Sequence, residues 1–448
     1  MMDALFIFLF FATFLCILFS GFPVAFVLGG VGVLFAALGT VIAPLDIADV
    51  AELRMIGFVA NRVFDTVSSY SLIPMSMFIF MGFMLDRSGI AERLLKSMRA
   101  ALGPAPGGLA IAVVVIGVVL AASTGIIGAS VVLLATIAVP TMFEAGYSRR
   151  VSLGTVGATG CLGILIPPSI MLVVMGDQLR IPVGDLFMGA ILPGAALALA
   201  FVLFIVVTAL LVPGTMPRYQ RSGAALPVTV LLREFAGALL APLALVLAVL
   251  GSIIAGIASP TEASGIGAAG ATLLAAMNRK LGWQDFREVC YQSARTTAFL
   301  YMLIFGAACF SVVLRGYGGD DVVAEALQAL PLGPHGVLAF VIFVVFLLGF
   351  FLDWMEIVLI VAPLVMPVLT GFGYDPVWLA ILLALVLQTS FLTPPVGMAL
   401  FYLRSAVPGA TIGEIYRGVI PFVLLQLATL AIVAAFPSLV LWLPSLQN

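Results

Sequence analysis

Apolar stretches long enough to cross a lipid bilayer recur from one end of the chain to the other. About 20 consecutive apolar residues in a helix cover the hydrocarbon core of a membrane. Roughly a quarter of the residues in a soluble domain are charged, whereas 9% of these are charged and 63% are hydrophobic. Lipid must therefore be the solvent for much of this surface. The sequence predicts an all-α protein that crosses the membrane many times.

We place ten spans by the limits of these stretches. They lie near residues 4–20, 22–41, 71–87, 150–176, 187–213, 236–255, 260–278, 296–314, 377–403 and 418–442. Two further apolar stretches, 108–143 and 336–371, are too long for one span, and each has a polar or glycine-rich middle. We interpret both as re-entrant hairpins, which enter and leave on one side. No basic residue precedes the first apolar stretch, so we expect it to remain as a span.

The second half of the chain repeats the first. The segment PTMFEAGY at 140–147 matches PVLTGFGY at 367–374 at an offset of 227 residues. In both copies a Pro-Pro pair begins 20 residues beyond the tyrosine, and Gly89 meets Gly316 at the same offset. Internal symmetry of this kind is typical of secondary transporters, whose two halves exchange roles as the site faces in or out.

The distribution of lysine and arginine predicts the orientation of the two copies. With both chain ends outside, 15 of the 19 basic residues fall on the inner side. The four on the outer side are Arg54, Arg62, Arg180 and Arg315. Matching loops then lie on opposite faces. We therefore predict two inverted repeats, residues 1–213 and 234–448, joined by a cytoplasmic linker at 214–233.

Four non-helical stretches are expected at membrane depth, where irregular backbone is tolerated only beside protein or a water-filled cavity. Two are the hairpin tips, Ser123 to Ser130 and Asp353 to Glu356, and two are the Pro-Pro breaks within 150–176 and 377–403. A Pro-Pro pair removes two backbone donors and frees the carbonyls opposite them. Freed carbonyls and hydroxyls suit a hard cation such as Na⁺, while half-helix N-termini favour an anionic group.

Pseudo-symmetry predicts one cation site on each pair of tip and break. The candidate cation ligands are Ser123, Thr124, Gly128, Ser130, Ile166, Pro167, Ser169, Asp353, Thr393, Pro394 and Gly397. The candidate substrate-binding residues are Ser130, Ser169, Glu356 and Thr393. Two plainer interpretations stay open. The breaks can be structural kinks, and the acidic residues of the second tip can be solvated at the outer interface.

Other function classes fit the sequence less well. A net charge of −2 indicates no nucleic-acid partner. A membrane-embedded enzyme needs a Ser/His pair, paired aspartates or a metal cluster in its spans, but the one histidine, His335, falls in a predicted outer loop. We interpret Glu262, in the SPTEAS segment, as a structural group bonded to a neighbouring break. A channel needs a continuous polar pore, whereas the breaks here are local.

Several motifs resemble those of one transporter family. They are SGFPVAFVLGGVG at 20–32, GASVVLLATIAVPTMFEAGY at 128–147, LGILIPPSI at 162–170, SPTEASGIGA at 259–268, FLD at 351–353, DPVW at 375–378 and LTPPVGMALF at 392–401. Spread over essentially the whole chain, they resemble the large membrane subunit of tripartite ATP-independent periplasmic (TRAP) transporters. Within that family the sequence looks nearest to the branch associated with 2-oxo acids, mannitol and chloroaromatic acids.

The resemblance implies a bacterial inner-membrane permease with the ion-transporter superfamily fold and an elevator mechanism. It implies Na⁺ as the coupling ion, no other cofactor, and a small organic acid as substrate. It also implies two partners, a small four-helix membrane subunit and a periplasmic substrate-binding protein. A transporter of the same fold that works without a binding protein is the alternative.

Overall fold

The computed structural model describes residues 2–45, 51–102, 105–124, 127–212, 214–217 and 228–446, and within these ranges every regular element is a helix. The first half contains α1 (Met2–Phe19), α2 (Val24–Ile42), α3 (Ile56–Ser68), α4 (Ile73–Arg87), α5 (Ile90–Leu102), α6 (Gly108–Thr124), α7 (Ile127–Glu144), α8 (Arg149–Cys161), α9 (Ile170–Leu179) and α10 (Val183–Leu211). The second half contains α11 (Val228–Ile254), α12 (Pro260–Met277), α13 (Trp283–Gly316), α14 (Gly319–Gln328), α15 (Pro334–Leu348), α16 (Trp354–Glu356), α17 (Ala362–Gly371), α18 (Pro376–Leu392), α19 (Met398–Ala406), α20 (Ile412–Ala435) and α21 (Ser438–Leu441). A π-helical turn, Ile357–Val361, connects α16 to α17.

Six of the described helices are long and apolar enough to cross a membrane, and a seventh crossing results if one bent pair counts as a single span. That pair joins Leu53–Ser68 to Tyr70–Arg87 at an angle of 58°. The prediction of a simple span at 71–87 therefore missed its first half, α3. Several other predicted spans consist of shorter helices, including α9 and α18, because breaks divide them. Polytopic helical architecture is thus confirmed.

The order of elements in the first half recurs in the second. Gly146 (φ 78°) and Gly373 (φ 89°) both adopt the left-handed conformation that favours glycine, at the predicted offset. The match of Gly89 with Gly316 is wrong by two residues. The left-handed glycines that precede α5 and α14 are Gly89 and Gly318, both at φ 69°.

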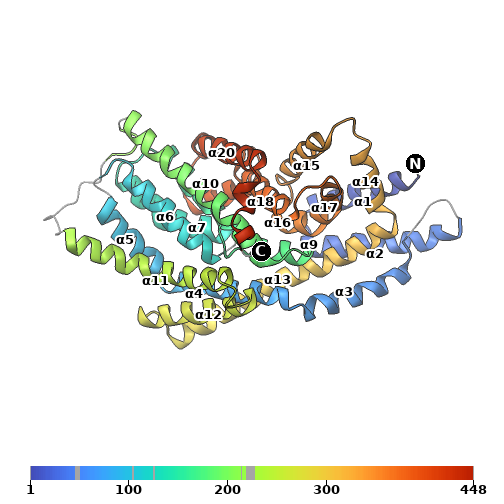
Figure 1. Ribbon diagram of the computed structural model, residues 1–448, viewed down its shortest axis with the longest axis horizontal. Coiled ribbons are helices and arrows are strands. Elements are labelled where there is room, and N and C mark those ends of the chain that lie inside the picture. Colours follow the sequence, from blue (N-terminus) through green and yellow to red (C-terminus); the bar gives the residue numbers. More distant parts are fainter. Residues whose placement is uncertain are drawn as a thin grey trace.

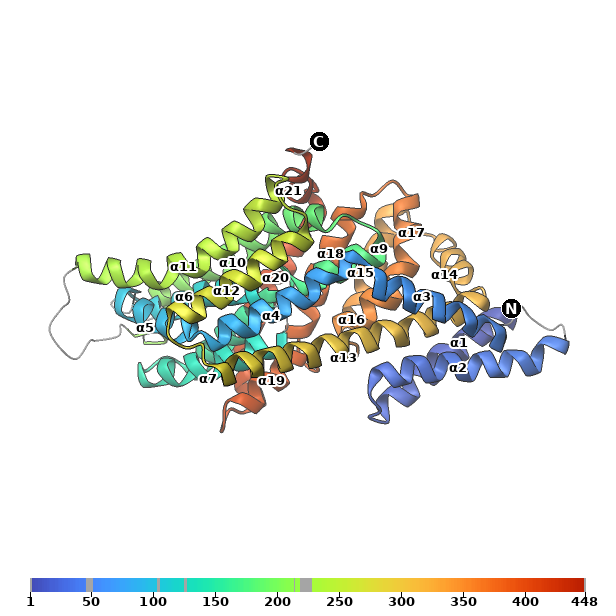
Figure 2. The ribbon, with the colours of Figure 1, turned by 90° about the horizontal axis from the view of Figure 1, so that it is seen from below.

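The helices form two layers along the length of the molecule (Figure 1). One layer contains α2, α3, α4, α11, α12 and α13, in which α2 packs on α13 and α4 packs on α12. The bent pair α3–α4 runs beside the long helix α13 (Figure 2). The other layer contains both hairpins, α6–α7 and α15–α17, together with α8, α10, α18 and α20.

The broken helices α8 and α18 lie at the centre of the second layer. Every residue of α18 from Val377 to Leu392 is buried, as expected for a helix that is apolar on all sides. Helix α8 approaches α20 so closely that a β-carbon on Gly154 would overlap the carbonyl oxygen of Gly418. Contact between backbones therefore connects the first repeat to the second at the core.

This close approach predicts a stability difference between two glycine substitutions. Gly154→Ala should destabilise the purified protein by ~1–3 kcal/mol, because the added methyl group overlaps the α20 backbone. Gly30→Ala is the matched control, since Gly30 is also helical and a β-carbon added there would have no neighbouring atom within 4 Å. Thermal unfolding in detergent measures both. Equal melting temperatures for the two variants would contradict the packing described here.

Candidate functional site

The first break separates α8 from α9. A short 3₁₀ turn, Leu162–Ile164, is followed by the cis peptide bond between Pro167 and Pro168, and α9 begins at Ile170. In a continuous helix the carbonyl oxygen of Ile164 would accept a bond from the N–H of residue 168, which proline lacks. The Ser169 hydroxyl donates to that carbonyl instead, at 2.5 Å, and Ser169 is fully buried. Ser169 thus stabilises the break from within.

The second break separates α18 from α19 and contains the cis bond between Pro394 and Pro395. Thr393 donates its hydroxyl proton to the carbonyl oxygen of Thr389 at 2.7 Å. The carbonyl of Phe391 loses its helical donor because residue 395 is proline. It lies near Gly397, where a β-carbon would be 2.6 Å from the oxygen of Phe391. A residue with a β-carbon at position 397 would therefore collide with this freed carbonyl, which favours glycine there.

Each hairpin packs against the break of its own repeat. At the first, a β-carbon on Gly160 would lie 2.9 Å from the α-carbon of Val131, the residue after Ser130. At the second, a β-carbon on Gly349 would overlap the hydroxyl oxygen of Ser390. Each hairpin therefore packs on the helix that leads to the break in the same half of the chain, and the cation sites expected at these places remain predictions.

The first tip also reaches the second repeat. Helix α7 packs on α19, and a β-carbon on Gly128 would lie 3.0 Å from the ring of Tyr402. Ser130 is buried in the first turn of α7. Of the other residues predicted at this tip, Gly125 and the side chains of Ser123 and Thr124 lie outside the part of the chain that the structure describes.

The second tip carries two acidic residues with different surroundings. Asp353 is half-buried and caps α16, because its Oδ1 accepts the Trp354 N–H at 2.8 Å. Glu356 is 3% exposed, and its Oε2 has no hydrogen-bond partner among the described residues. The interpretation of Glu356 as solvated at an interface is therefore wrong. A buried carboxylate oxygen without a partner is costly in a membrane protein and marks a functional position.

Four further side chains that are fully buried and polar were not predicted. The hydroxyls of Thr155 and Thr159 on α8 and the amides of Gln388 on α18 and Gln426 on α20 have no partner in the described chain. Three of the four stand in the broken helices α8 and α18, and the fourth stands in α20, which packs on α8. An amide in an otherwise apolar span was the one signal in the sequence that could have indicated Gln388.

Two residues that we judged to be outside the site have structural bonds. Glu262 accepts from the N–H and the hydroxyl of Ser259, both at 2.8 Å, in the capping box that begins α12. Glu262 is therefore structural, but its described bonds are to the cap of its own helix and not to a neighbouring break. His335, in the first turn of α15, bonds through Nδ1 to the Tyr374 hydroxyl at 2.7 Å.

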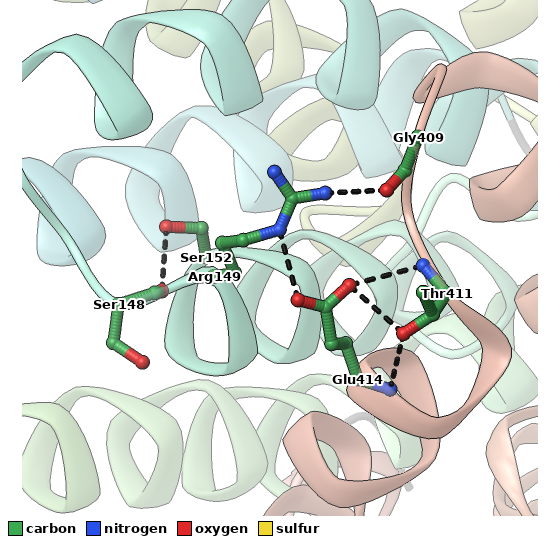
Figure 3. A network of polar contacts seen from close by, with 6 residues as sticks. All are labelled: Ser148, Arg149, Ser152, Gly409, Thr411 and Glu414. Carbon is green, nitrogen blue, oxygen red and sulfur yellow. Dashed lines mark hydrogen bonds and ion pairs between the residues drawn. The ribbon is translucent and has the colours of Figure 1, made fainter.

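A polar network connects the two repeats at one end of the broken helices (Figure 3). Arg149, in the first turn of α8, donates from Nε to Glu414 at 2.9 Å and from Nη2 to the carbonyl oxygen of Gly409 at 2.7 Å. Glu414 also caps α20 through Thr411 at 2.9 Å. Together with the contact of Gly154 with Gly418, this network makes α8 and α20 one packed unit.

The arrangement of the helices has a counterpart among solved structures. It is similar to the solved structure of the Alcanivorax borkumensis YdaH transporter, with a TM-score of 0.64 over 91% of this chain and 96% of that one, at 14% sequence identity. Residues 11–439 match the family described as the tripartite ATP-independent periplasmic transporter, DctM component. The chain therefore belongs to the DctM family of TRAP transporter large permeases, which are membrane transporters and not enzymes.

Relatives within the family have different named substrates. The chain is 33% identical over 392 residues to the C4-dicarboxylate TRAP transporter large permease protein DctM of Pseudomonas aeruginosa, covering 86% of this chain and 89% of that one. It is 29% identical over 431 residues to the isethionate TRAP transporter permease protein DctMQ of Oleidesulfovibrio alaskensis. That match covers 96% of this chain and 64% of the longer relative.

The close packing at Gly397 predicts the effect of adding one methyl group there. Gly397→Ala should lower the initial uptake rate of the reconstituted transporter about tenfold, equivalent to ~1.4 kcal/mol of lost stabilisation, because the methyl group overlaps the carbonyls of Phe391 and Thr393. Gly413→Ala on α20 is the control, since its added carbon meets open space. Uptake by the Gly397→Ala variant at the control rate would show that the break carries no binding function.

Proposed function

We propose that this chain is the permease of a Na⁺-coupled importer of small organic anions. The observation that supports this most is that each hairpin packs on the helix that leads to a Pro-Pro break. A break supplies carbonyl oxygens and hydroxyls, and a neighbouring half-helix N-terminus supplies positive potential. The first set of groups suits a hard cation and the second an anion, which are the two solutes that a symporter must hold together.

The cation sites that we propose use the oxygen atoms of the breaks. On the first, Ser169 and Ile164 already bond to one another, so their oxygens have fixed positions. At the second break, the Thr393 hydroxyl is fixed by its hydrogen bond to the Thr389 carbonyl. The Phe391 carbonyl has no helical donor, because residue 395 is proline and lacks an N–H. Preformed oxygen ligands reduce the ordering cost of ion binding.

The hairpins and broken helices form the moving body of an elevator in this proposal, and we include α10 and α20 in it. The backbone contact of Gly154 with Gly418 and the Arg149 network leave α20 no freedom to slide past α8. The layer built around α2, α4, α12 and α13 is then the static scaffold, which carries the small four-helix membrane subunit. One bond connects scaffold and moving body at the bend between α3 and α4, where Ser69 donates to Asp177 of α9 at 3.0 Å.

Relatives suggest the chemical class of the substrate. One is named for C4-dicarboxylates and another for isethionate, and both of these are small organic anions. We propose that a periplasmic binding protein delivers a carboxylate of this size to the permease. The alternative, transport without a binding protein, predicts full uptake by the membrane subunits alone.

Removing break hydroxyls tests the cation sites. Ser169→Ala and Thr393→Ala should each raise the Na⁺ concentration for half-maximal uptake about fivefold, because each loses one bond worth ~1 kcal/mol that holds a ligand carbonyl. Ser405→Ala is the matched control, since that hydroxyl makes the same kind of bond, to the Tyr402 carbonyl, on the exposed side of α19. Binding-protein affinity for the substrate should not change. Wild-type Na⁺ dependence in both variants would make the breaks simple kinks.

A reversible crosslink tests the motion. Ser69→Cys/Asp177→Cys, bridged by a short cleavable thiol reagent, should stop uptake, and cleavage should restore it, because the bridge joins scaffold to moving body. The control bridge, Arg149→Cys/Glu414→Cys, lies within the moving body and should leave most uptake intact. Cys16, Cys161, Cys290 and Cys309 are replaced by serine in both. Full uptake with the first bridge in place would rule out an elevator that separates these two groups.

A further inference from the structure

A polar cavity lies away from the breaks, between the two layers. Its volume is about 290 Å³. Helices α3 and α13 of the proposed scaffold form one wall, and the end of α9 and the second hairpin form the other. The residues that line it include Arg62, Arg180, Arg315, Gln178, Ser311 and Leu359. We call it the arginine cavity.

Three distant segments each contribute one arginine to this cavity. Arg62 stands on α3, Arg315 lies in the last turn of α13, and Arg180 follows α9 in a left-handed conformation with φ 56°. They are three of the four basic residues that the sequence placed on the outer face. A left-handed backbone is uncommon for a residue with a β-carbon, and here it places the guanidinium group in the wall of the cavity.

Acidic groups near the cavity do not line it. Asp320 pairs with Arg315 at 3.0 Å, and Asp65 lines an adjoining cavity together with Arg62 and Arg315. Asp177 accepts from Ser69 and from Gln178. The described lining itself includes three guanidinium groups and no carboxylate. Positive groups are therefore the only charged groups in the described lining, and clefts lined by charge of one sign concentrate ligands of the other.

We propose that the arginine cavity is an anion-binding site, which holds the acidic group of the substrate on the outer side before the substrate reaches the breaks. Guanidinium groups bind carboxylates and sulfonates through paired hydrogen bonds. Gln178 and Ser311 add neutral polar groups, and Leu359 adds an apolar surface for the carbon chain. The volume is at the lower end for small-molecule sites, which favours a small anion over an acidic loop of a protein. This inference rests on the proposed import of organic anions.

The position of the cavity gives it a place in the transport cycle. Its arginines come from both sides of the boundary between scaffold and moving body. Arg62 and Arg315 belong to the scaffold, and Arg180 belongs to the moving body. Movement of the moving body past the scaffold would separate Arg180 from Arg62 and Arg315. The site would therefore hold an anion tightly in one state and release it in the other, as a secondary transporter requires.

Charged thiol reagents test this site even while the substrate is unidentified. Ala308→Cys, in the cavity wall, is introduced into full-length protein whose four cysteines are serines. A sulfonate-bearing methanethiosulfonate reagent should react faster than its trimethylammonium counterpart by about tenfold, relative to their ratio on free cysteine. Arg62→Gln, Arg180→Gln and Arg315→Gln should each reduce this preference severalfold. Arg54→Gln is the control and should not, because Arg54 pairs with Glu52 and does not line the cavity.

Protection from labelling identifies the occupant. Succinate or isethionate should slow modification of the introduced thiol in the Ala308→Cys protein and have less effect when Arg180→Gln is added. No charge preference, or a preference unchanged by all three arginine substitutions, would overturn the proposal. Protection by a loaded binding protein but by neither free anion would also overturn it, in favour of a protein-docking surface. Intact preference and protection in a complex that drives no uptake would leave this site in place and reject the proposed function.

Discussion

Hydrocarbon supplies no hydrogen bonds, so a backbone group that loses its helical partner inside the membrane must find another in the protein. Each Pro-Pro pair in this chain creates that need at the centre of a span. At the first break the Ser169 hydroxyl meets it by bonding to the carbonyl of Ile164. At the second, the Gly397 N–H donates to the carbonyl of Thr393 at 3.1 Å, and the freed carbonyl of Phe391 lies close to Gly397. The hairpins pack on the half-helices that lead to these breaks, and α10 and α20 enclose them, so the arrangement of the whole second layer follows from two local interruptions.

The same constraint explains why polar groups gather where they do. Glu356 Oε2, the hydroxyls of Thr155 and Thr159 and the amides of Gln388 and Gln426 are buried without protein partners in the described chain, and they belong to the second hairpin, the broken helices and α20. Bonded polar groups elsewhere have evident structural tasks, such as the capping boxes of Glu262 and Glu414. Unpaired polar atoms in the core are therefore concentrated in the elements that we propose to move and to bind solutes.

Much of this architecture could be predicted because its signals are periodic or repeated. Long apolar runs located the spans, and the offset of 227 residues located both breaks, since proline pairs and glycine turns leave clear marks in a sequence. Three features could not be found in this way. Helix α3 is amphipathic and short, and no local signal shows that it continues into α4. Burial of Glu356 depends on helices far away in the chain. The convergence of Arg62, Arg180 and Arg315 is purely tertiary, because their segments have no common pattern. The helix pairs of both expected hairpins and both Pro-Pro breaks lie where they were predicted. Re-entry of the hairpins, inversion of the two halves and the ligand sets at the breaks remain predictions.

Coupling to sodium is the central claim, and one measurement addresses it directly. The complex of this chain with its small subunit, reconstituted in liposomes with loaded binding protein outside, is given an inward Na⁺ gradient and no ATP. We predict accumulation of substrate against its gradient, abolished when the ionophore monensin dissipates the Na⁺ gradient and absent when an inward H⁺ gradient replaces it. Accumulation driven equally well by H⁺ without Na⁺ would contradict the assignment of the breaks as sodium sites.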